Sequence, residues 1–204
     1  TREDFRDFVD AAHEHGIYVI LDIIAHHTGN VFAYAADRYP VRDPGTGETY
    51  NDPRWDGKPY TVQGFNDRHG RPTIPGDPPD STRLETAWPD GAVWPREFQN
   101  LGMFLRKGHI TNWDYYPEYA EGDMFNLRTL DLWAEQEGQS RKVSSALGCL
   151  VVAYCFWIAY ADRDGFRIDA AKHMGIEALR TFCDAIREFA QSIGKERFLL
   201  AGEI

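Results

Sequence analysis

Two acidic residues define the chemistry that this chain can perform. Asp169 ends the strand-like segment 164–169, and Glu203 stands near the end of a second one, 197–204. An amphipathic helix is predicted between them, over 175–193, and such a crossover usually makes the two strands parallel neighbours. Neighbouring strands lie about 4.8 Å apart, so both carboxylates can face one pocket. A separation of roughly 5–5.5 Å suits the nucleophile and the acid/base of a retaining glycosidase.

The pattern of apolar residues predicts an α/β fold with parallel strands. A helix begins at Thr1, and the segment 17–24 is apolar on both faces, as in a parallel sheet covered by helices. An apolar helix is predicted near 140–160, followed by a strand over 165–170. Between 28 and 123, Pro, Gly, Asn and Asp interrupt nearly every stretch, and an irregular segment of that length is expected to form a functional subdomain. The two acids stand at the C-terminal ends of strands, where α/β barrels place their chemistry.

Three strands cannot complete such a barrel. They leave two unpaired edges, whereas closure needs about eight strands. We therefore interpret the chain as a segment of a larger barrel, with 1–27 and 124–204 as the partial barrel and 28–123 as an insertion. An open doubly wound domain is the alternative, although it normally has more strands.

Composition limits the partners of the chain. Its net charge of −10 argues against nucleic acid and against an anionic membrane as partners, and no apolar stretch is long enough to span a bilayer. Cys149, Cys155 and Cys183 have neither disulfide nor metal spacing, so buried thiols are expected. Cytoplasmic and secreted locations both stay open.

Three motifs resemble those of the alpha-amylase family of glycoside hydrolases (family thirteen), which is built on a TIM (β/α)8 barrel. Residues 21–27, Leu-Asp-Ile-Ile-Ala-His-His, resemble the motif Asp-Val-Val-x-Asn-His that ends the third strand. Residues 165–173 match Gly-Phe-Arg-x-Asp-x-x-Lys-His at nearly every position, and residues 201–204 resemble the motif that ends the fifth strand. The resemblance implies a partial TIM barrel of about the third to fifth strands, with 28–123 in the place of the family's domain B.

The resemblance also implies a reaction and a role for each acid. The family cleaves α-glycosidic bonds of α-glucans and oligosaccharides by double displacement with retention of configuration. Asp169 is then the nucleophile, and Glu203 first protonates the leaving oxygen and later deprotonates the incoming water or sugar. Arg167, two residues earlier on the same strand face, favours an ionised nucleophile. Whether water or a sugar is the acceptor stays open.

The remaining site residues follow from the same motifs. His27 is expected to hydrogen-bond the sugar ring, and Lys172 and His173 to line the leaving-group side. Asp22 is expected to support the site from the strand end, and together with Arg167 these residues form the predicted substrate-binding set. Each also has a structural reading, as an ordinary polar residue at a strand or helix end.

Aromatic side chains of the irregular segment can stack on the CH-rich faces of sugars, or else form the core of a subdomain. They are Trp55, Trp88, Trp94, Trp113, Tyr115 and Tyr116.

Two departures from the family pattern concern calcium. His26 stands where many members have an Asn ligand, and Asn126 stands where the family has an Asp. Because Ca²⁺ prefers oxygen ligands, we expect no required cofactor and a calcium site that is weak or absent. A transition-metal site at His26 and His27 lacks a third ligand at suitable spacing.

A third carboxylate of the family, an Asp at the end of the seventh strand, lies outside the 204 residues. We therefore expect the chain by itself to be inactive, because stabilisation of the transition state is incomplete. The alternative function is an inactive barrel that binds a sugar or a protein. An unrelated α/β hydrolase is disfavoured, because no Gly-x-Ser-x-Gly motif is present.

Overall fold

The chain folds into two compact units in a computed structural model. Unit 1 comprises Thr1–His26 and Leu132–Ile204, and unit 2 comprises His27–Asp131. The structure describes residues 1–35, 40–42, 45, 47, 49–66, 96–133, 135–137 and 140–204.

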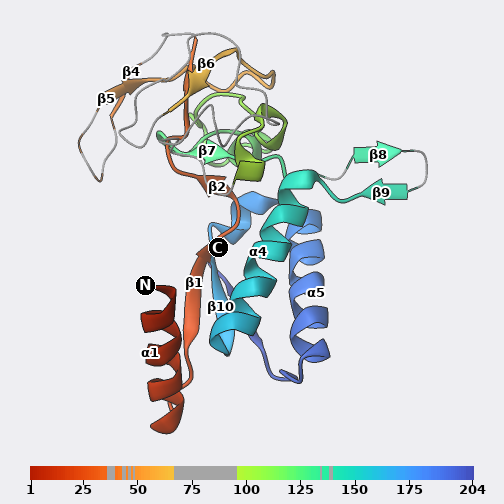
Figure 1. The fold of residues 1–204 in the computed structure, drawn as a ribbon. Coiled ribbons are helices and arrows are strands. Elements are labelled where there is room, and N and C mark those ends of the chain that lie inside the picture. Colours follow the sequence, from red (N-terminus) through yellow and green to blue (C-terminus); the bar gives the residue numbers. More distant parts are fainter. Residues whose placement is uncertain are drawn as a thin grey trace. The chain divides into compact units, whose positions relative to one another are not determined.

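Unit 1 is built on a three-stranded parallel sheet with the order β1-β10-β11. Figure 1 shows β1 beside β10. Helix α1 contacts α4, and α4 contacts α5. The elements of unit 1 are α1 (Arg2–Glu14), β1 (Ile20–Ile24), β8 (Glu135–Glu137), β9 (Ser140–Lys142), α4 (Ser145–Ala161), β10 (Gly165–Asp169), the 3-10 helix η4 (Ala171–Met174), α5 (Ile176–Ser192) and β11 (Leu199–Gly202).

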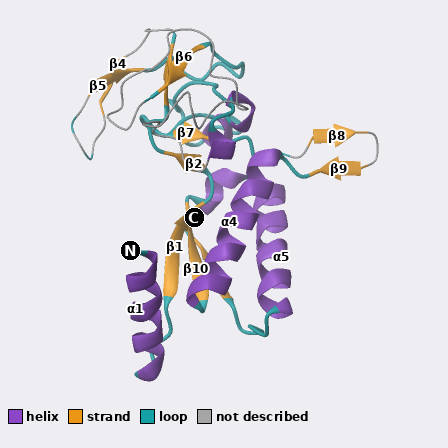
Figure 2. Cartoon of the chain, viewed as in Figure 1, coloured by secondary structure: helices purple, strands orange, loops and turns teal. Residues whose placement is uncertain are grey.

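Several predicted element boundaries were wrong. The segment 197–204 forms a strand only over Leu199–Gly202, so Glu203 lies just after it. The strand predicted over 17–24 begins only at Ile20, because the Ile17 N–H donates to the Ala12 carbonyl and closes the end of α1. The helix predicted near 140–160 begins at Ser145, because the preceding residues of β9 pair with β8 in a hairpin (Figure 2). Ser144 caps α4 by accepting a hydrogen bond from the Leu147 N–H.

The core of unit 1 lies between the central strand and its helices. Phe166 and Ile168 of β10 are fully buried, as are Phe182 and Ile186 of α5. β1 is less covered than predicted: Ile20 and Ile24 are nearly half exposed, whereas Ile23, on the other face of the strand, is buried. Successive side chains of a strand point to opposite faces, so one face of β1 is covered and the other is open.

Asp164 connects three elements at the N-terminal end of this sheet. Its Oδ2 lies 2.8 Å from Nε2 of His13 on α1 and accepts a hydrogen bond of 2.7 Å from the Val19 N–H ahead of β1. One carboxylate therefore joins α1, β1 and β10.

The three cysteines are free and half-buried, whereas buried thiols were predicted. Cys149 and Cys155 lie on α4 and Cys183 lies on α5, and helical periodicity leaves one side of a surface helix open. Burial raises the pKa of the Cys155 and Cys183 thiols. No helix within the described ranges combines the length and apolar character needed to cross a membrane.

Unit 2 consists of short antiparallel strand pairs joined by loops, namely β2-β7, β3-β6 and β4-β5. Trp88 and Trp94 lie outside the described residues. The elements of unit 2 are β2 (His27–Thr28), β3 (Phe32–Tyr34), β4 (Pro40–Arg42), β5 (Thr49–Asn51), β6 (Val62–Phe65), the 3-10 helices η2 (Arg96–Phe98) and η3 (Leu101–Met103), α3 (Glu118–Glu121) and β7 (Arg128–Thr129).

A buried ion cluster organises unit 2. The Arg128 guanidinium is buried, and its Nη1 lies 2.5 Å from Asp52 and 3.4 Å from Asp123, both also buried. Its Nε donates to the Phe32 carbonyl, and the rings of Phe32 and Tyr34 each lie 5.0 Å from it. Buried charges persist only when paired and hydrogen-bonded, and here two carboxylates share one cation.

Asp123 is the second carboxylate that pairs with Arg128 in this ion cluster. It accepts hydrogen bonds from the Tyr34 hydroxyl at 2.6 Å and the Thr129 N–H at 2.8 Å. Burial raises the pKa of Asp123 to about 6, although Arg128 and these donors oppose the rise. Burial likewise raises the pKa of the Tyr34 hydroxyl.

This raised pKa predicts a pH-dependent stability. The folded Asp123 binds a proton below about pH 6, whereas the unfolded carboxyl binds it only below its ordinary value of 3.8. The stabilisation is therefore complete below about pH 4 and is lost as pH rises through 6. Relative to Asp123→Asn, the unfolding free energy of the wild type is expected to fall by about 3 kcal/mol between these limits. Urea unfolding of both proteins at each pH measures this, and a pH-independent difference contradicts it.

Candidate active site

Asp22, Arg167 and Asp169 are placed by the register of the sheet. Asp22 pairs directly with Arg167 across β1 and β10. Asp169 is two residues beyond Arg167, so both side chains leave the same face of the strand. Glu203 follows β11 directly, and its N–H donates to the Ile168 carbonyl, which places it beside the end of β10.

One guanidinium joins all three acids. Nη1 of Arg167 lies 2.9 Å from each carboxylate oxygen of Asp22 and 3.0 Å from Oδ1 of Asp169. Nη2 of the same side chain lies 2.6 Å from Oε2 of Glu203. Because Asp169 and Glu203 contact the same small group, their separation lies below the upper limit of roughly 9.5 Å for the carboxyl pairs of glycosidases.

The three acids remain accessible. The side chains of Asp169, Glu203 and Asp22 are 31%, 53% and 64% exposed. The hydrogen bond to Asp22, followed by the charges of the three carboxylates, raises the pKa of Arg167. The guanidinium is therefore a permanent positive charge among acids that a ligand can reach.

The chain turns sharply after Asp169. Ala170 has a φ of 52°, a left-handed conformation that is unfavourable for a residue with a side chain, and the 3-10 helix η4 follows it. A Cβ on Gly202 would lie 3.0 Å from the Cβ of Ala171, so β11 passes close to this turn. The turn ends β10 at Asp169 and leaves that carboxylate at the strand end.

The structure places only some of the other predicted residues beside these acids. Lys172 is exposed on η4, and its N–H donates to the Glu203 carbonyl. His173 is half-buried, and its ring centroid lies 5.7 Å from that of the buried His26. His27 belongs to unit 2, where it is buried and pairs with Thr129 in the β2-β7 ladder.

Tyr154 is a site-supporting residue that the sequence did not reveal. It belongs to the apolar pattern of α4, yet its hydroxyl donates to the carbonyl of Ile24 at the C-terminal end of β1. Burial raises the pKa of this hydroxyl to about 12. No sequence signal distinguishes it from a core aromatic residue.

The donor set at the two family calcium positions does not fit calcium. Ca²⁺ takes 6–8 oxygen ligands, whereas His26 offers nitrogen and is packed against His173. Asn126 offers one neutral amide oxygen, from a half-buried turn. Within the described ranges, no three His, Cys, Asp or Glu side chains are arranged to hold a metal ion.

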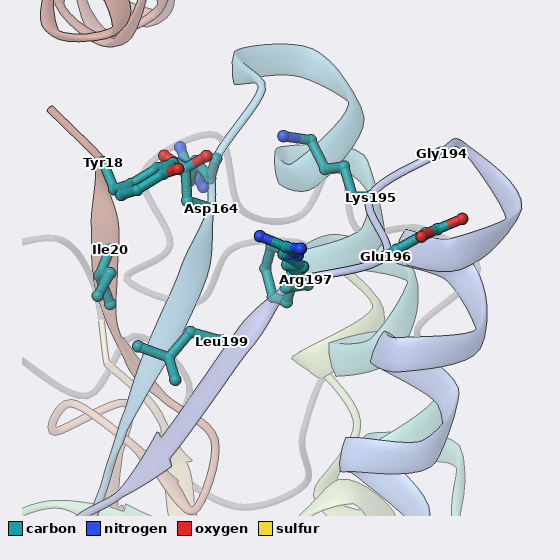
Figure 3. A pocket seen from close by; sticks show the side chains of 10 residues that line it. Tyr18, Ile20, Asp164, Gly194, Lys195, Glu196, Arg197 and Leu199 are labelled. Carbon is teal, nitrogen blue, oxygen red and sulfur yellow. The ribbon is translucent and has the colours of Figure 1, made fainter. Parts of the chain in front are cut away.

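A cavity of about 580 Å³ lies at the opposite end of the sheet from the acids. Its lining includes Tyr18, Asp164 and Leu199, which mark the N-terminal ends of the three strands (Figure 3). In α/β barrels the active site lies at the C-terminal ends of the strands. We therefore assign the candidate active site to Arg167 and the three acids that it contacts, and not to this cavity.

The chain is similar in sequence to known proteins. Residues 1–193 match the model of the alpha-amylase family, described as the alpha amylase catalytic domain. The chain is 27% identical over 206 residues to an alpha-amylase of Streptomyces lividans, covering all of this chain and 21% of that protein. It is 32% identical over 104 residues to a cyclomaltodextrin glucanotransferase of Klebsiella oxytoca, covering 51% of this chain and 14% of that protein.

Solved structures show the same fold. The alpha-amylase of Geobacillus thermoleovorans, complexed with acarbose, superposes with a TM-score of 0.53 and 20% identity, over 100% of this chain and 29% of that one. An Anoxybacillus alpha-amylase superposes with a TM-score of 0.55 and 21% identity, over 99% of this chain and 28% of that one. The chain has an α/β fold that is part of a TIM barrel.

The family match covers nearly the whole chain, and the chain therefore belongs to the alpha-amylase family of glycoside hydrolases. It spans 21% of the length of its Streptomyces relative.

Proposed function

We propose that this chain is the central part of the catalytic domain of a retaining glycosidase or transglycosylase that acts on α-glucans. One observation carries the proposal: a single guanidinium, that of Arg167, contacts both Asp169 and Glu203 at the ends of adjacent parallel strands. The names of the relatives, an amylase and a glucanotransferase, support the substrate class.

Asp169 is the nucleophile in this proposal. Its ion pair with Arg167 engages one carboxylate oxygen, Oδ1, and holds the carboxylate at the end of β10. Attack on the anomeric carbon forms the bond between that oxygen and the sugar, while the bond to the leaving oxygen breaks. The covalent glycosyl-enzyme divides one difficult substitution into two easier ones.

Glu203 is the acid and the base. It donates its proton to the leaving oxygen in the first step and takes one from water or from a sugar hydroxyl in the second. Protonation of Glu203 ends its Coulomb attraction to Nη2 of Arg167. Asp22 then holds the guanidinium in place through Nη1, so that the contact with the nucleophile does not depend on Glu203.

The remaining parts of the chain position the catalytic residues and the sugar. The strands β1, β10 and β11 correspond to about the third to fifth strands of the barrel, and the segment 28–123 to a domain-B-like insertion. His27, Lys172 and His173 are proposed to contact the sugar. The exposure of Lys172 beside Glu203 supports its part in this set.

The test is the stereochemistry of the product. Proton NMR of maltooligosaccharide cleavage by the complete catalytic domain is expected to show the α-anomer first, because two inversions retain the configuration. An initial β-anomer contradicts the assignment of Asp169 as a nucleophile. The 204-residue chain alone is expected to release no reducing sugar, because it supplies two of the three carboxylates of the family.

A further inference from the structure

The C-terminal end of β1 lies beside the proposed nucleophile. Ile24 is the last residue of β1 and pairs with Asp169 in the register of β1 and β10. Because side chains alternate along a strand, those of Ile24 and Asp22 leave the same face of the sheet. The position of this strand end therefore determines where Asp22 stands relative to Arg167, its partner on β10.

This strand end is weakly held by the sheet itself. In the part of the chain that the structure describes, β1 has one paired neighbour, β10. The pairing stops at Ile24 and Asp169, and the chain turns sharply after β10 at Ala170. The end of a strand that is paired on one side opens more readily than the interior of a sheet.

Tyr154 of α4 supplies a second attachment for this strand end. Its hydroxyl donates a hydrogen bond of 2.5 Å to the Ile24 carbonyl. Its ring packs edge-to-face on Phe166 of β10 at 5.5 Å and on Phe182 of α5 at 5.7 Å, and both of these rings are fully buried. Burial raises the pKa of the Tyr154 hydroxyl to about 12, so the hydroxyl keeps its proton and remains a donor at neutral pH.

Tyr154 acts from the face of the sheet opposite to the acids. It contacts Phe166, whose side chain points to the helix-covered face of β10. Arg167 and Asp169 alternate with Phe166 along the strand, so their side chains leave the other face. Tyr154 therefore influences the site through the backbone of Ile24, not through a contact with the sugar.

We propose that Tyr154 is a positioning residue, which holds the end of β1 so that Asp22 keeps the Arg167 guanidinium against Asp169. Both oxygens of Asp22 lie 2.9 Å from Nη1 of Arg167, and the same nitrogen lies 3.0 Å from Asp169. A shift of β1 moves Asp22 and the guanidinium together, and a misplacement of about 1 Å can cost about 100-fold in rate. This inference rests on the proposed function, in which Asp169 is the nucleophile.

Tyr154→Phe tests the proposal, because it keeps the ring and removes only the hydroxyl. In the complete catalytic domain, this substitution is expected to lower kcat on maltooligosaccharides about tenfold and to leave KM within about twofold, since no sugar contact is lost. Tyr160→Phe is the matched control. It removes a hydroxyl from the same helix, 3.5 Å from the exposed Glu3, and is expected to leave both constants unchanged.

A double-mutant cycle separates positioning from a general structural role. In an Asp22→Asn background, Tyr154→Phe is expected to lower kcat by less than about twofold, because the contact that it positions is already lost. Hydrogen exchange of the segment 20–26 is expected to become faster in Tyr154→Phe and to stay unchanged in Tyr160→Phe. Equal losses of kcat in both backgrounds, or unchanged exchange, overturn the proposal.

Failure of this proposal is distinguishable from failure of the proposed function. A slow Asp169→Asn enzyme together with a wild-type kcat in Tyr154→Phe overturns the positioning role alone. A wild-type rate in Asp169→Asn contradicts the proposed function, and the positioning role is overturned with it.

Discussion

Replacing Asp169 by Asn is expected to lower kcat on maltooligosaccharides by about 10⁴-fold or more in the complete catalytic domain, since single members of a nucleophilic catalytic set carry effects of that order. Asparagine keeps the size of the side chain but removes the charge that attacks the anomeric carbon. It also removes one ion pair of Arg167, whereas the pairs with Asp22 and Glu203 remain. Initial rates of reducing-sugar release measure the effect.

Two comparisons make the Asp169 result specific. Asp184→Asn makes the same substitution on the exposed side of α5 and is expected to leave the rate unchanged. Mass spectrometry of the wild type quenched during turnover is expected to find a glycosyl group on Asp169. A rate within tenfold of wild type in Asp169→Asn, or an adduct on another residue, places the nucleophile elsewhere.

Replacing Arg128 by Met is expected to destabilise the protein by about 3–5 kcal/mol, the largest loss from a single side chain that we foresee, because it leaves the buried carboxylates of Asp52 and Asp123 without their cation. Methionine preserves most of the apolar stem, so the loss reports charge and hydrogen bonding rather than volume. Urea unfolding at pH 7 measures the difference in unfolding free energy.

An exposed arginine provides the control for Arg128. Arg180→Met removes a charge that lies 4.0 Å from Glu177, with both side chains more than half exposed, and is expected to change stability by less than about 0.5 kcal/mol. If Arg128→Met is too unstable to purify, Arg128→Lys, which keeps the charge but not the forked hydrogen bonds, is expected to show a smaller loss. A loss below about 1 kcal/mol for Arg128→Met is inconsistent with a stabilising cluster.

The sequence predicted the features of this protein that depend on local pattern. The apolar periodicity of α5 and the acidic ends of β10 and β11 predicted adjacent parallel strands, and the structure has them with the order β1-β10-β11. The motif around Asp169 identified the family before any geometry was known, because motif residues stand close together in the chain. The contact between Arg167 and Asp169 was also predictable, since residues two apart on a strand share a face.

Tertiary structure alone decided which distant side chains meet. Arg167 also contacts Glu203 and Asp22, and these contacts depend on the register of β1, β10 and β11. The alternation of residues along one strand does not specify its register against the next strand. The pairing of Arg128 with Asp52 joins residues far apart in an irregular segment that has no periodicity to read. Tyr154 fits the apolar pattern of α4, but in the structure its hydroxyl donates a hydrogen bond to the Ile24 carbonyl of β1. This contact forms only when α4 packs on the sheet, so the sequence pattern does not reveal it.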